Sequence, residues 1–138
     1  MPITGGCLCG KVRYQIAADM PLGVRQCWRR LCQCLSAGGG TVNATFPKDG
    51  ITVTGETAVY TSVADSGATM HRRFCPACGT PLFSEAEPRP NVIIVRVGTL
   101  DDPELGRPES AIWTRSAPKW ACFDPALPRV EGQPAPAK

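Results

Sequence analysis

The chain has 138 residues, a length that fits one domain with a hydrophobic core of its own. Its formal net charge is +3 and its basic residues are scattered, which argues against a nucleic-acid-binding protein, because such proteins gather lysine and arginine in a stripe. No stretch approaches the ~18 consecutive apolar residues of a membrane helix, and the first ten residues lack the basic start and apolar run of a signal peptide. We therefore expect a cytoplasmic protein that binds neither nucleic acid nor a membrane.

Short segments of alternating apolar and polar residues, separated by turn signals, make up most of the sequence. In residues 11–16, for example, Val12, Tyr14 and Ile16 alternate with polar side chains. Strands are predicted over residues 11–16, 41–46, 51–54, 58–61, 70–74, 81–84, 91–97 and 111–114, with a short helix or turn within 27–35. Fourteen glycines and fourteen prolines favour turns over long helices, so the predicted fold class is mainly β.

The strand predicted over residues 91–97 is a continuous apolar run, which suggests burial on both faces. From Pro125 onward the chain is rich in proline and alanine. We expect one domain over residues 1–128, followed by a loose C-terminal tail over residues 129–138.

Two close cysteine pairs lie far apart in the sequence. Cys7 and Cys9 occur in G-G-C-L-C-G, and Cys75 and Cys78 occur in F-C-P-A-C-G-T. Two short loops that each supply two thiolates are typical of a tetrahedral structural zinc site. Two disulfides are the weaker interpretation, because a C-x-C pair closes a strained ring and nothing indicates secretion.

A second cysteine group consists of Cys27, Cys32 and Cys34 in C-W-R-R-L-C-Q-C. Three protein ligands with one open position are the form of a catalytic zinc, which can lower the pKa of a bound water or thiol. Three free cysteines packed as small apolar residues are an equally good interpretation of the spacing.

The motifs of this chain resemble those of one enzyme family. Four segments carry the resemblance: G-G-C-L-C-G-K-V-R-Y at the start, F-C-P-A-C-G-T-P-L, V-R-V-G-T-L-D-D-P, and the residues around Trp113 and Trp120. They are similar to successive signatures of the glutathione-dependent formaldehyde-activating enzyme family, which includes relatives of centromere protein V. The resemblance implies an Mss4-like fold of small coiled β-sheets around a structural zinc on Cys7, Cys9, Cys75 and Cys78.

The resemblance also implies an activity. Members condense glutathione with formaldehyde to S-hydroxymethylglutathione, and because the reverse reaction breaks a carbon–sulfur bond, the expected class is carbon–sulfur lyase. We expect a zinc-dependent enzyme that acts on thiol adducts, of the glutathione type, of a small aldehyde or related electrophile. The family places a second, catalytic zinc on a C-x-C-x-x-C motif.

This sequence departs from the family at that second motif. Cys27 and Cys32 align with the first and third cysteines, but Arg29 occupies the middle position and Trp28 stands where many members have histidine. A guanidinium has no free lone pair for a metal. Three interpretations follow: Cys34 supplies the missing thiolate, or Arg29 activates a metal-free thiol, or the domain is catalytically inactive and binds a small molecule or a protein.

A few other charged residues are weaker candidates. His71, the only histidine, could act as an acid–base group. Arg72 and Arg73 could bind the carboxylates of a glutathione-like ligand, but as neighbours on a strand they point to opposite faces, and solvated surface charge is the simpler explanation. Asp101 and Asp102 precede a proline and are typical of a turn.

Overall fold

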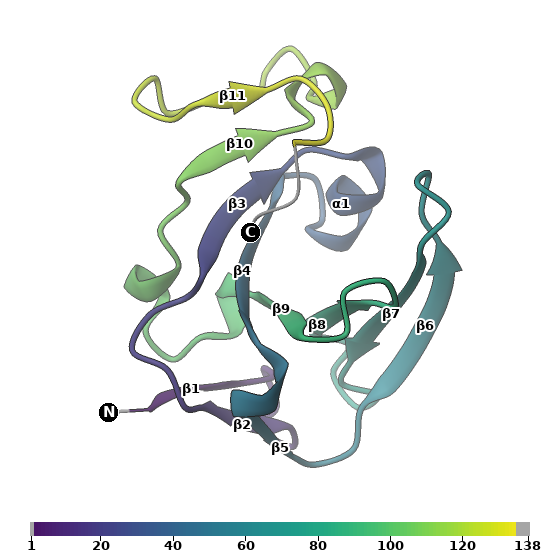
Figure 1. Cartoon of the computed structure of the whole chain (residues 1–138), viewed down its shortest axis with the longest axis vertical. Helices are drawn as coiled ribbons and strands as arrows, with labels where there is room; N and C mark the ends of the chain where they lie inside the picture. The colour runs from purple at the N-terminus through teal and green to yellow at the C-terminus, as the bar shows by residue number, and fades with distance from the viewer. Residues whose placement is uncertain (1, 135–138) are drawn as a thin grey trace.

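The computed structural model describes residues 2–134, which form two β-sheets and one short α-helix (Figure 1). The small sheet has the order β1-β2-β5, and the large sheet has the order β11-β10-β3-β4-β9-β8-β7-β6. The strands of the small sheet are β1 (Ile3–Gly6), β2 (Arg13–Ile16) and β5 (Ile51–Thr54). Those of the large sheet are β3 (Gly23–Cys27), β4 (Thr41–Pro47), β6 (Ala58–Val63), β7 (Thr69–Phe74), β8 (Pro81–Ala86), β9 (Val92–Arg96), β10 (Ser110–Ile112) and β11 (Arg129–Val130). The mainly β fold class predicted from the sequence is confirmed.

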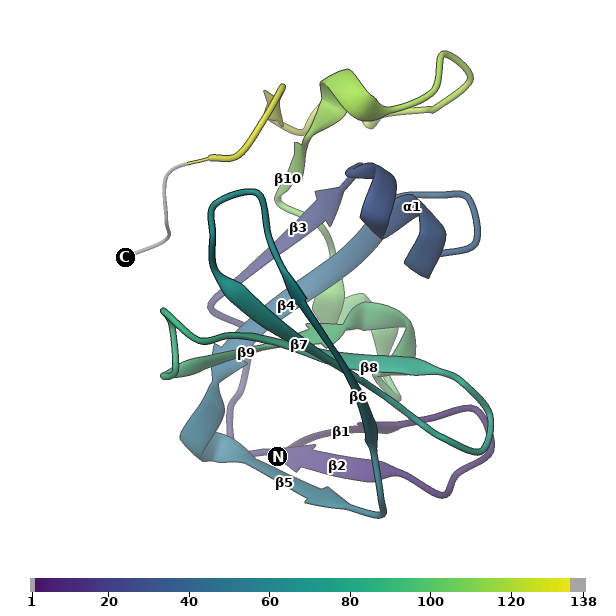
Figure 2. The same ribbon diagram turned by 90° about the vertical axis from the view of Figure 1, so that its right-hand side faces the viewer.

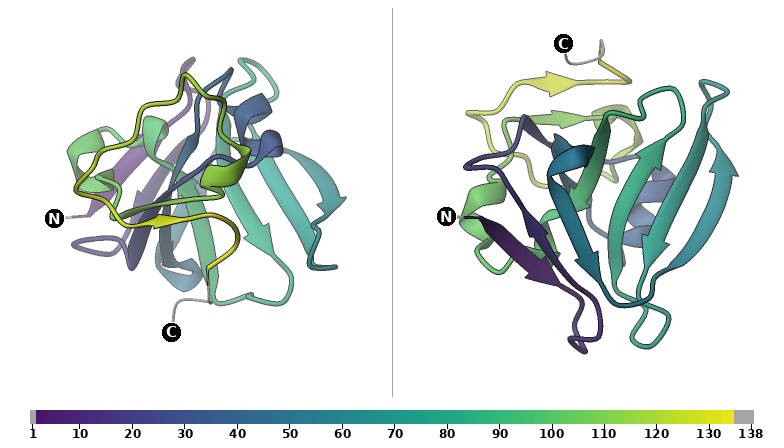
Figure 3. Two further views of the ribbon diagram at one scale, coloured as in Figure 1. Left: turned by 90° about the horizontal axis from the view of Figure 1, so that it is seen from above. Right: turned by 60° about the horizontal axis from the view of Figure 1, so that its bottom comes forward.

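The helix α1 (Arg30–Leu35) begins three residues after β3 ends. It lies inside the curve of the large sheet, opposite the tip of the β6–β7 hairpin (Figures 1 and 2). The small sheet crosses the other end of the molecule (Figure 3). No helix within residues 2–134 is long and apolar enough to cross a membrane.

The hydrophobic core lies between the small sheet and one face of the large sheet. Val12, Tyr14 and Ile16 enter it as the alternating pattern predicts, and they meet Phe46 and Phe83 from the large sheet. The Tyr14 and Phe83 rings meet edge to face, with centroids 5.2 Å apart. The Tyr14 hydroxyl shares a hydrogen bond of 2.8 Å with the Thr99 hydroxyl, so the one polar atom of that side chain is paired inside the core.

Two strand boundaries differ from the predicted ones, at the start of β2 and at the end of β10. β2 begins at Arg13 rather than at residue 11, because the Cys7 N–H donates to the Val12 carbonyl and residues 7–12 form a turn. β10 ends at Ile112, because Trp113 adopts a left-handed backbone conformation with φ 56°. Burial in β9 alternates, with Ile93 and Val95 buried, so the expected burial on both faces was wrong.

Three strands were not predicted from the sequence, namely β1, β3 and β11. The expectation of a loose tail after residue 128 was wrong for its first part, because Arg129–Val130 pair in parallel with Ala111 and Ile112. Glu131 and Gly132 then accept backbone hydrogen bonds from Arg115 and Trp113. Residues 135–138 of the expected tail lie outside the described residues.

Gly5 in β1 provides a test of this packing. A Cβ atom at this position would overlap the Tyr14 ring and the Thr99 carbonyl oxygen, both of which are fixed in the core. We expect Gly5→Ala to lower the free energy of unfolding by roughly 3 kcal/mol, as overpacked sites do. Denaturant unfolding monitored by circular dichroism measures the change.

Gly23→Ala is the matched control, because nothing lies within 4 Å of the added Cβ there. Equal unfolding midpoints for the two variants would contradict the packing described for Gly5.

Candidate functional site

Cys7, Cys9, Cys75 and Cys78 converge at one point, and we call this group the cysteine clip. Their sulfur atoms all lie within 4.8 Å of one another. The Cys7–Cys9 and Cys9–Cys75 sulfur distances are 3.6 and 3.8 Å. Ligand bonds of about 2.3 Å in a tetrahedron place the sulfurs about 3.8 Å apart. The clip therefore has the dimensions of a tetrahedral metal site.

Two tight turns build the cysteine clip. Gly10 and Gly79, each just after a cysteine pair, have φ of 82° and 78°, a region that glycine enters without strain. The Gly79 N–H donates to the Cys75 carbonyl, and the Cys75 N–H donates to the Thr80 carbonyl. The clip therefore ties the β1–β2 turn to the β7–β8 turn.

The electrostatics of the cysteine clip favour a bound cation. A hydrogen bond with the Thr80 side chain, together with backbone N–H groups, lowers the pKa of Cys78 to about 5. For Cys9 a backbone hydrogen bond lowers the pKa, but burial and the neighbouring thiols outweigh it and raise the pKa to about 11. Four thiols at this spacing resist joint ionisation unless a metal ion compensates the charge.

The second cysteine group is only partly assembled. Cys27 at the end of β3 and Cys32 in α1 are both buried and pack with Ile112. Cys34 is exposed, because two helical residues differ by about 200° around the axis and it therefore points away from Cys32. Within residues 2–134 the cysteine clip is the one group of three or more cysteine, histidine or acidic side chains with metal-ligand spacing.

A row of polar side chains crosses the face of the large sheet opposite the core. Strand register places on this face, in order, Ser62, Arg72, Ser84, Arg96, Asn43, Thr41 and Cys27, and we call this set the polar row. Arg72 donates to Ser62 at 2.6 Å, and Arg96 donates to Asn43 at 2.5 Å and to Ser84 at 2.6 Å. The row ends beneath α1, next to Cys32.

Charge in the polar row acts on Cys32. A hydrogen bond from Cys27 and another with Thr41 stabilise the Cys32 thiolate, and Arg96 and Arg29 attract it; together they overcome burial and lower the pKa of Cys32 to about 6. The same coupling and burial raise the pKa of Cys27. The hydrogen bond between the two thiols therefore favours ionisation of Cys32 over ionisation of Cys27.

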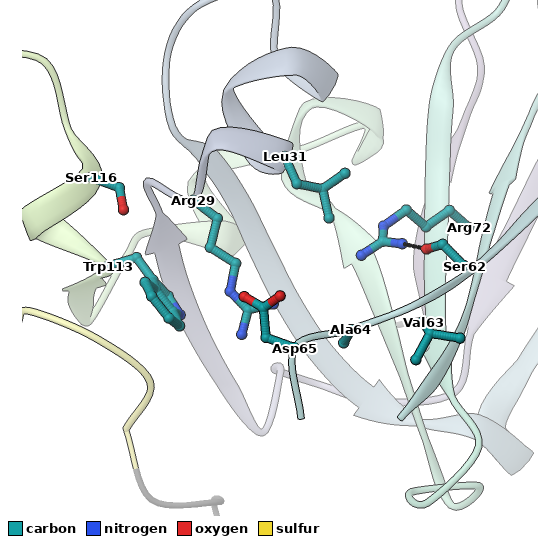
Figure 4. Close-up of a pocket in the computed structure, with 9 residues that line it drawn as sticks. All are labelled: Arg29, Leu31, Ser62, Val63, Ala64, Asp65, Arg72, Trp113 and Ser116. Atoms are coloured by element: carbon teal, nitrogen blue, oxygen red, sulfur yellow. Dashed lines mark hydrogen bonds between the residues drawn. The ribbon is translucent and has the colours of Figure 1, made fainter. Parts of the chain in front are cut away.

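A pocket of about 160 Å³ opens between α1, the β6–β7 hairpin and the segment after β10 (Figure 4). Arg29 and Arg72 enter it from opposite sides. Its remaining lining residues are Leu31 from α1, Ser62 to Asp65 from the β6–β7 hairpin, and Trp113 and Ser116.

Arg29 is held by the C-terminal part of the chain. Its guanidinium lies 4.7 Å from the centre of the Trp113 ring, in cation–π contact, and Arg115 lies against the same ring at 4.9 Å. The Gln133 side-chain oxygen accepts from both Arg29, at 2.7 Å, and the Trp113 ring N–H, at 3.0 Å. Arg29, which we expected from the sequence at the position of a family cysteine, is thus held in the pocket wall.

The other charged candidates from the sequence lie outside this pocket. His71 contacts Thr61 and Glu87 near the surface, and Arg73 pairs with Glu85. Asp101 pairs with Arg13, and the Asp102 side chain accepts from the Glu104 N–H at a turn. Sequence reasoning missed Arg96, although a single arginine within the apolar run of residues 92–97 was a usable signal.

Comparison with known proteins places the chain in a family. The family model for glutathione-dependent formaldehyde-activating enzymes matches residues 2–116. A protein of Halomonas elongata, whose name provisionally describes a glutathione-dependent formaldehyde-activating enzyme, is 28% identical over 127 residues, which is 87% of this chain and 80% of the relative. The crystal structure of a Rhodobacter sphaeroides protein has the same fold, with a TM-score of 0.60 and 21% identity, and the match covers 76% of this chain and 96% of that one. With the cysteine clip and the fold on which it is built, these matches show that the chain belongs to the glutathione-dependent formaldehyde-activating enzyme family.

Proposed function

We propose that this protein forms and breaks carbon–sulfur bonds between a thiol of the glutathione type and a small aldehyde. The observation that carries the proposal is the pocket lined by Arg29 and Arg72, both of which interact electrostatically with the buried thiol of Cys32. Family membership supports the reaction class, because the family is described by glutathione-dependent formaldehyde activation.

We assign a structural zinc to the cysteine clip. Four sulfurs at tetrahedral spacing, two of them on buried cysteines, fit this metal better than harder cations that prefer oxygen. Bound there, zinc would stabilise the folded state and take no part in the reaction. The pocket lies near α1 at the opposite end of β7 from Cys75 and Cys78.

The second group does not fit a zinc ion. Cys27 and Cys32 offer two thiolates, Cys34 is exposed, and the guanidinium groups of the polar row and Arg29 act on the same thiols. Positive charge close to these thiols opposes the binding of a divalent cation between them. In this chain the guanidinium groups supply the positive charge that stabilises a thiolate.

The proposed reaction uses Arg29 and Arg72, which line the pocket, and the thiolate of Cys32, which is buried and lies outside the pocket lining. Cys32, as thiolate, accepts the proton of the incoming thiol. The resulting substrate thiolate, stabilised by Arg29, adds its electron pair to the aldehyde carbon, and the carbonyl oxygen becomes an alkoxide beside Arg72. The alkoxide takes the proton back from Cys32, which gives the hydroxyalkyl thioether and restores the site.

A non-catalytic binding domain is the second candidate function. The replacement of a family cysteine by Arg29 favours it, because the third thiolate of the family's second motif is missing. This candidate predicts that the purified protein leaves the rate of thiol–aldehyde addition unchanged and that Cys27→Ser has little effect on binding of its ligand.

The zinc assignment predicts one metal ion per chain. Purified protein should contain about one zinc, and Cys75→Ser should lose it and fail to fold, since a structural zinc supplies folding free energy. Metal analysis and thermal unfolding before and after treatment with a strong chelator measure both effects.

Cys34→Ser serves as the control for this experiment, because Cys34 is exposed and remote from the clip. It should keep its zinc and its melting temperature. A Cys75→Ser protein that folds and melts like the wild type would refute the structural role.

The proposed reaction predicts that Cys32→Ser slows thiol–aldehyde addition by about 100-fold, the usual effect of removing a positioned acid–base group. NMR exchange spectroscopy of glutathione and formaldehyde at equilibrium measures the rate in both directions. Cys122→Ser, at an exposed cysteine outside the pocket, should react like the wild type. Equal rates for wild type and Cys32→Ser would argue for the binding domain.

A further inference from the structure

Arg29 and Arg72 in the pocket, and Arg96 beside Arg72 in the polar row, form no ion pair with any described residue. Within residues 2–134 the ion pairs involve Arg13, Lys48, His71 and Arg73, so Arg29, Arg72 and Arg96 form none. Their hydrogen bonds all go to neutral oxygens: Gln133 for Arg29, Ser62 for Arg72, and Asn43 and Ser84 for Arg96. Three positive charges are therefore gathered without an ion pair, and Asp65 is the one carboxylate among the residues that line the pocket.

Burial makes this arrangement costly. Arg72 has only 9% of its surface exposed. Burial lowers the pKa of both Arg72 and Arg96, and like charges lower them further, since Arg29 acts on Arg72 and Arg72 acts on Arg96. The Cys32 thiolate opposes this effect, but a single thiolate leaves an excess of positive charge.

Two of the three arginines also carry an unpaired donor, and one of these two, Arg29, lines the pocket. The described part of the chain has three buried side-chain donors without a partner: Trp28 Nε1, Arg29 Nε and Arg96 Nε. Buried polar groups of folded proteins are normally paired, and an unpaired one calls for an explanation. Arg96 belongs to the polar row, and Trp28 and Arg29 lie between Cys27 and α1.

The size of the pocket limits what can enter. Its volume of about 160 Å³ is well below the roughly 300–1,000 Å³ of pockets that enclose drug-sized ligands. One small group fits, and a whole tripeptide would have to extend outward. Planar guanidinium groups bind carboxylates through paired hydrogen bonds, which favours a carboxylate as that group.

We propose that Arg29 and Arg72 in the pocket, with the neighbouring charge of Arg96 in the polar row, form a receptor for the carboxylate of a small organic acid. The inference rests on the proposed function and sharpens it, because it requires one of the two substrates to present a carboxylate to Arg29 and Arg72. The carboxylate belongs either to the carbonyl substrate, as in a 2-oxo acid, or to the thiol.

Asp65 is the internal competitor for this receptor. It is the one carboxylate among the residues that line the pocket, and it lies in the turn of the β6–β7 hairpin. No ion pair joins it to Arg29 or Arg72. Removing its negative charge should therefore strengthen the binding of an external anion.

The test uses acetate as the probe and acetamide, its neutral analogue, as the reference. Both are titrated into the zinc-containing protein at constant ionic strength and followed by NMR chemical shifts. We expect acetate to bind at least 10-fold more tightly than acetamide, the effect of a hydrogen bond to a charged group. Equal affinities, or equal competition by chloride, would overturn the proposal.

Two variants and one control sharpen the test. Arg72→Gln should weaken acetate binding about 10-fold or more, and Asp65→Asn should strengthen it. Arg73→Gln, at the neighbouring arginine that pairs with Glu85, should leave the affinity unchanged. Because Asp65 is exposed, its variant keeps the test decisive even if Arg72→Gln fails to fold. The inference would be overturned if Asp65→Asn bound acetate with the wild-type affinity and Arg72→Gln, provided that it folds, did so too.

Competition for bound acetate identifies the source of the carboxylate. Displacement by glyoxylate assigns it to the carbonyl substrate, and displacement by glutathione but not by cysteamine assigns it to the thiol. The outcome is separable from the proposed reaction: acetate binding without thiol–aldehyde addition overturns the reaction alone, and addition without acetate binding overturns this inference alone.

Discussion

The cysteine clip is the constraint on which the rest of the structure depends. It joins two turns that lie more than sixty residues apart, and so fixes the small sheet against β7 and β8. That contact closes the core around Tyr14 and Phe83 on one face of the large sheet. With this face filled by apolar side chains, the opposite face is free to carry the polar row.

One face of the large sheet packs in the hydrophobic core, and the opposite face carries the polar side chains of the proposed site. Alternation along each strand sends Phe83 and Val95 to the core, and Ser84 and Arg96 to the other side. The strands hold the arginines of the polar row in register, so the charges keep their spacing without help from a metal. An element only six residues long, α1, then covers the end of the row and brings Cys32 to Cys27.

The sequence was informative where local pattern and metal spacing decide the structure. The mainly β class and the cysteine clip could be predicted, because alternation and paired cysteines are local signals. β3 and β11 were missed, since each is stabilised by pairing with strands distant in sequence. The role of Arg72 was underestimated for the same reason: only strand register shows that it faces Ser84 and Arg96 while Arg73 faces Glu85. Cys34 looked like a third ligand by spacing, but the helical turn directs it away.

The contact between Gln133 and Arg29 gives the C-terminal segment a share in the pocket. The family match ends at residue 116, yet the side chain that orients Arg29 lies seventeen residues further on, beyond β11. Any movement of Arg29 toward a ligand must stretch its hydrogen bond to Gln133 or shift the Trp113 ring that both residues contact. Binding of a ligand in the pocket is thereby coupled to the edge strand β11 of the large sheet. A change in the environment of β11 would therefore indicate that the pocket is occupied.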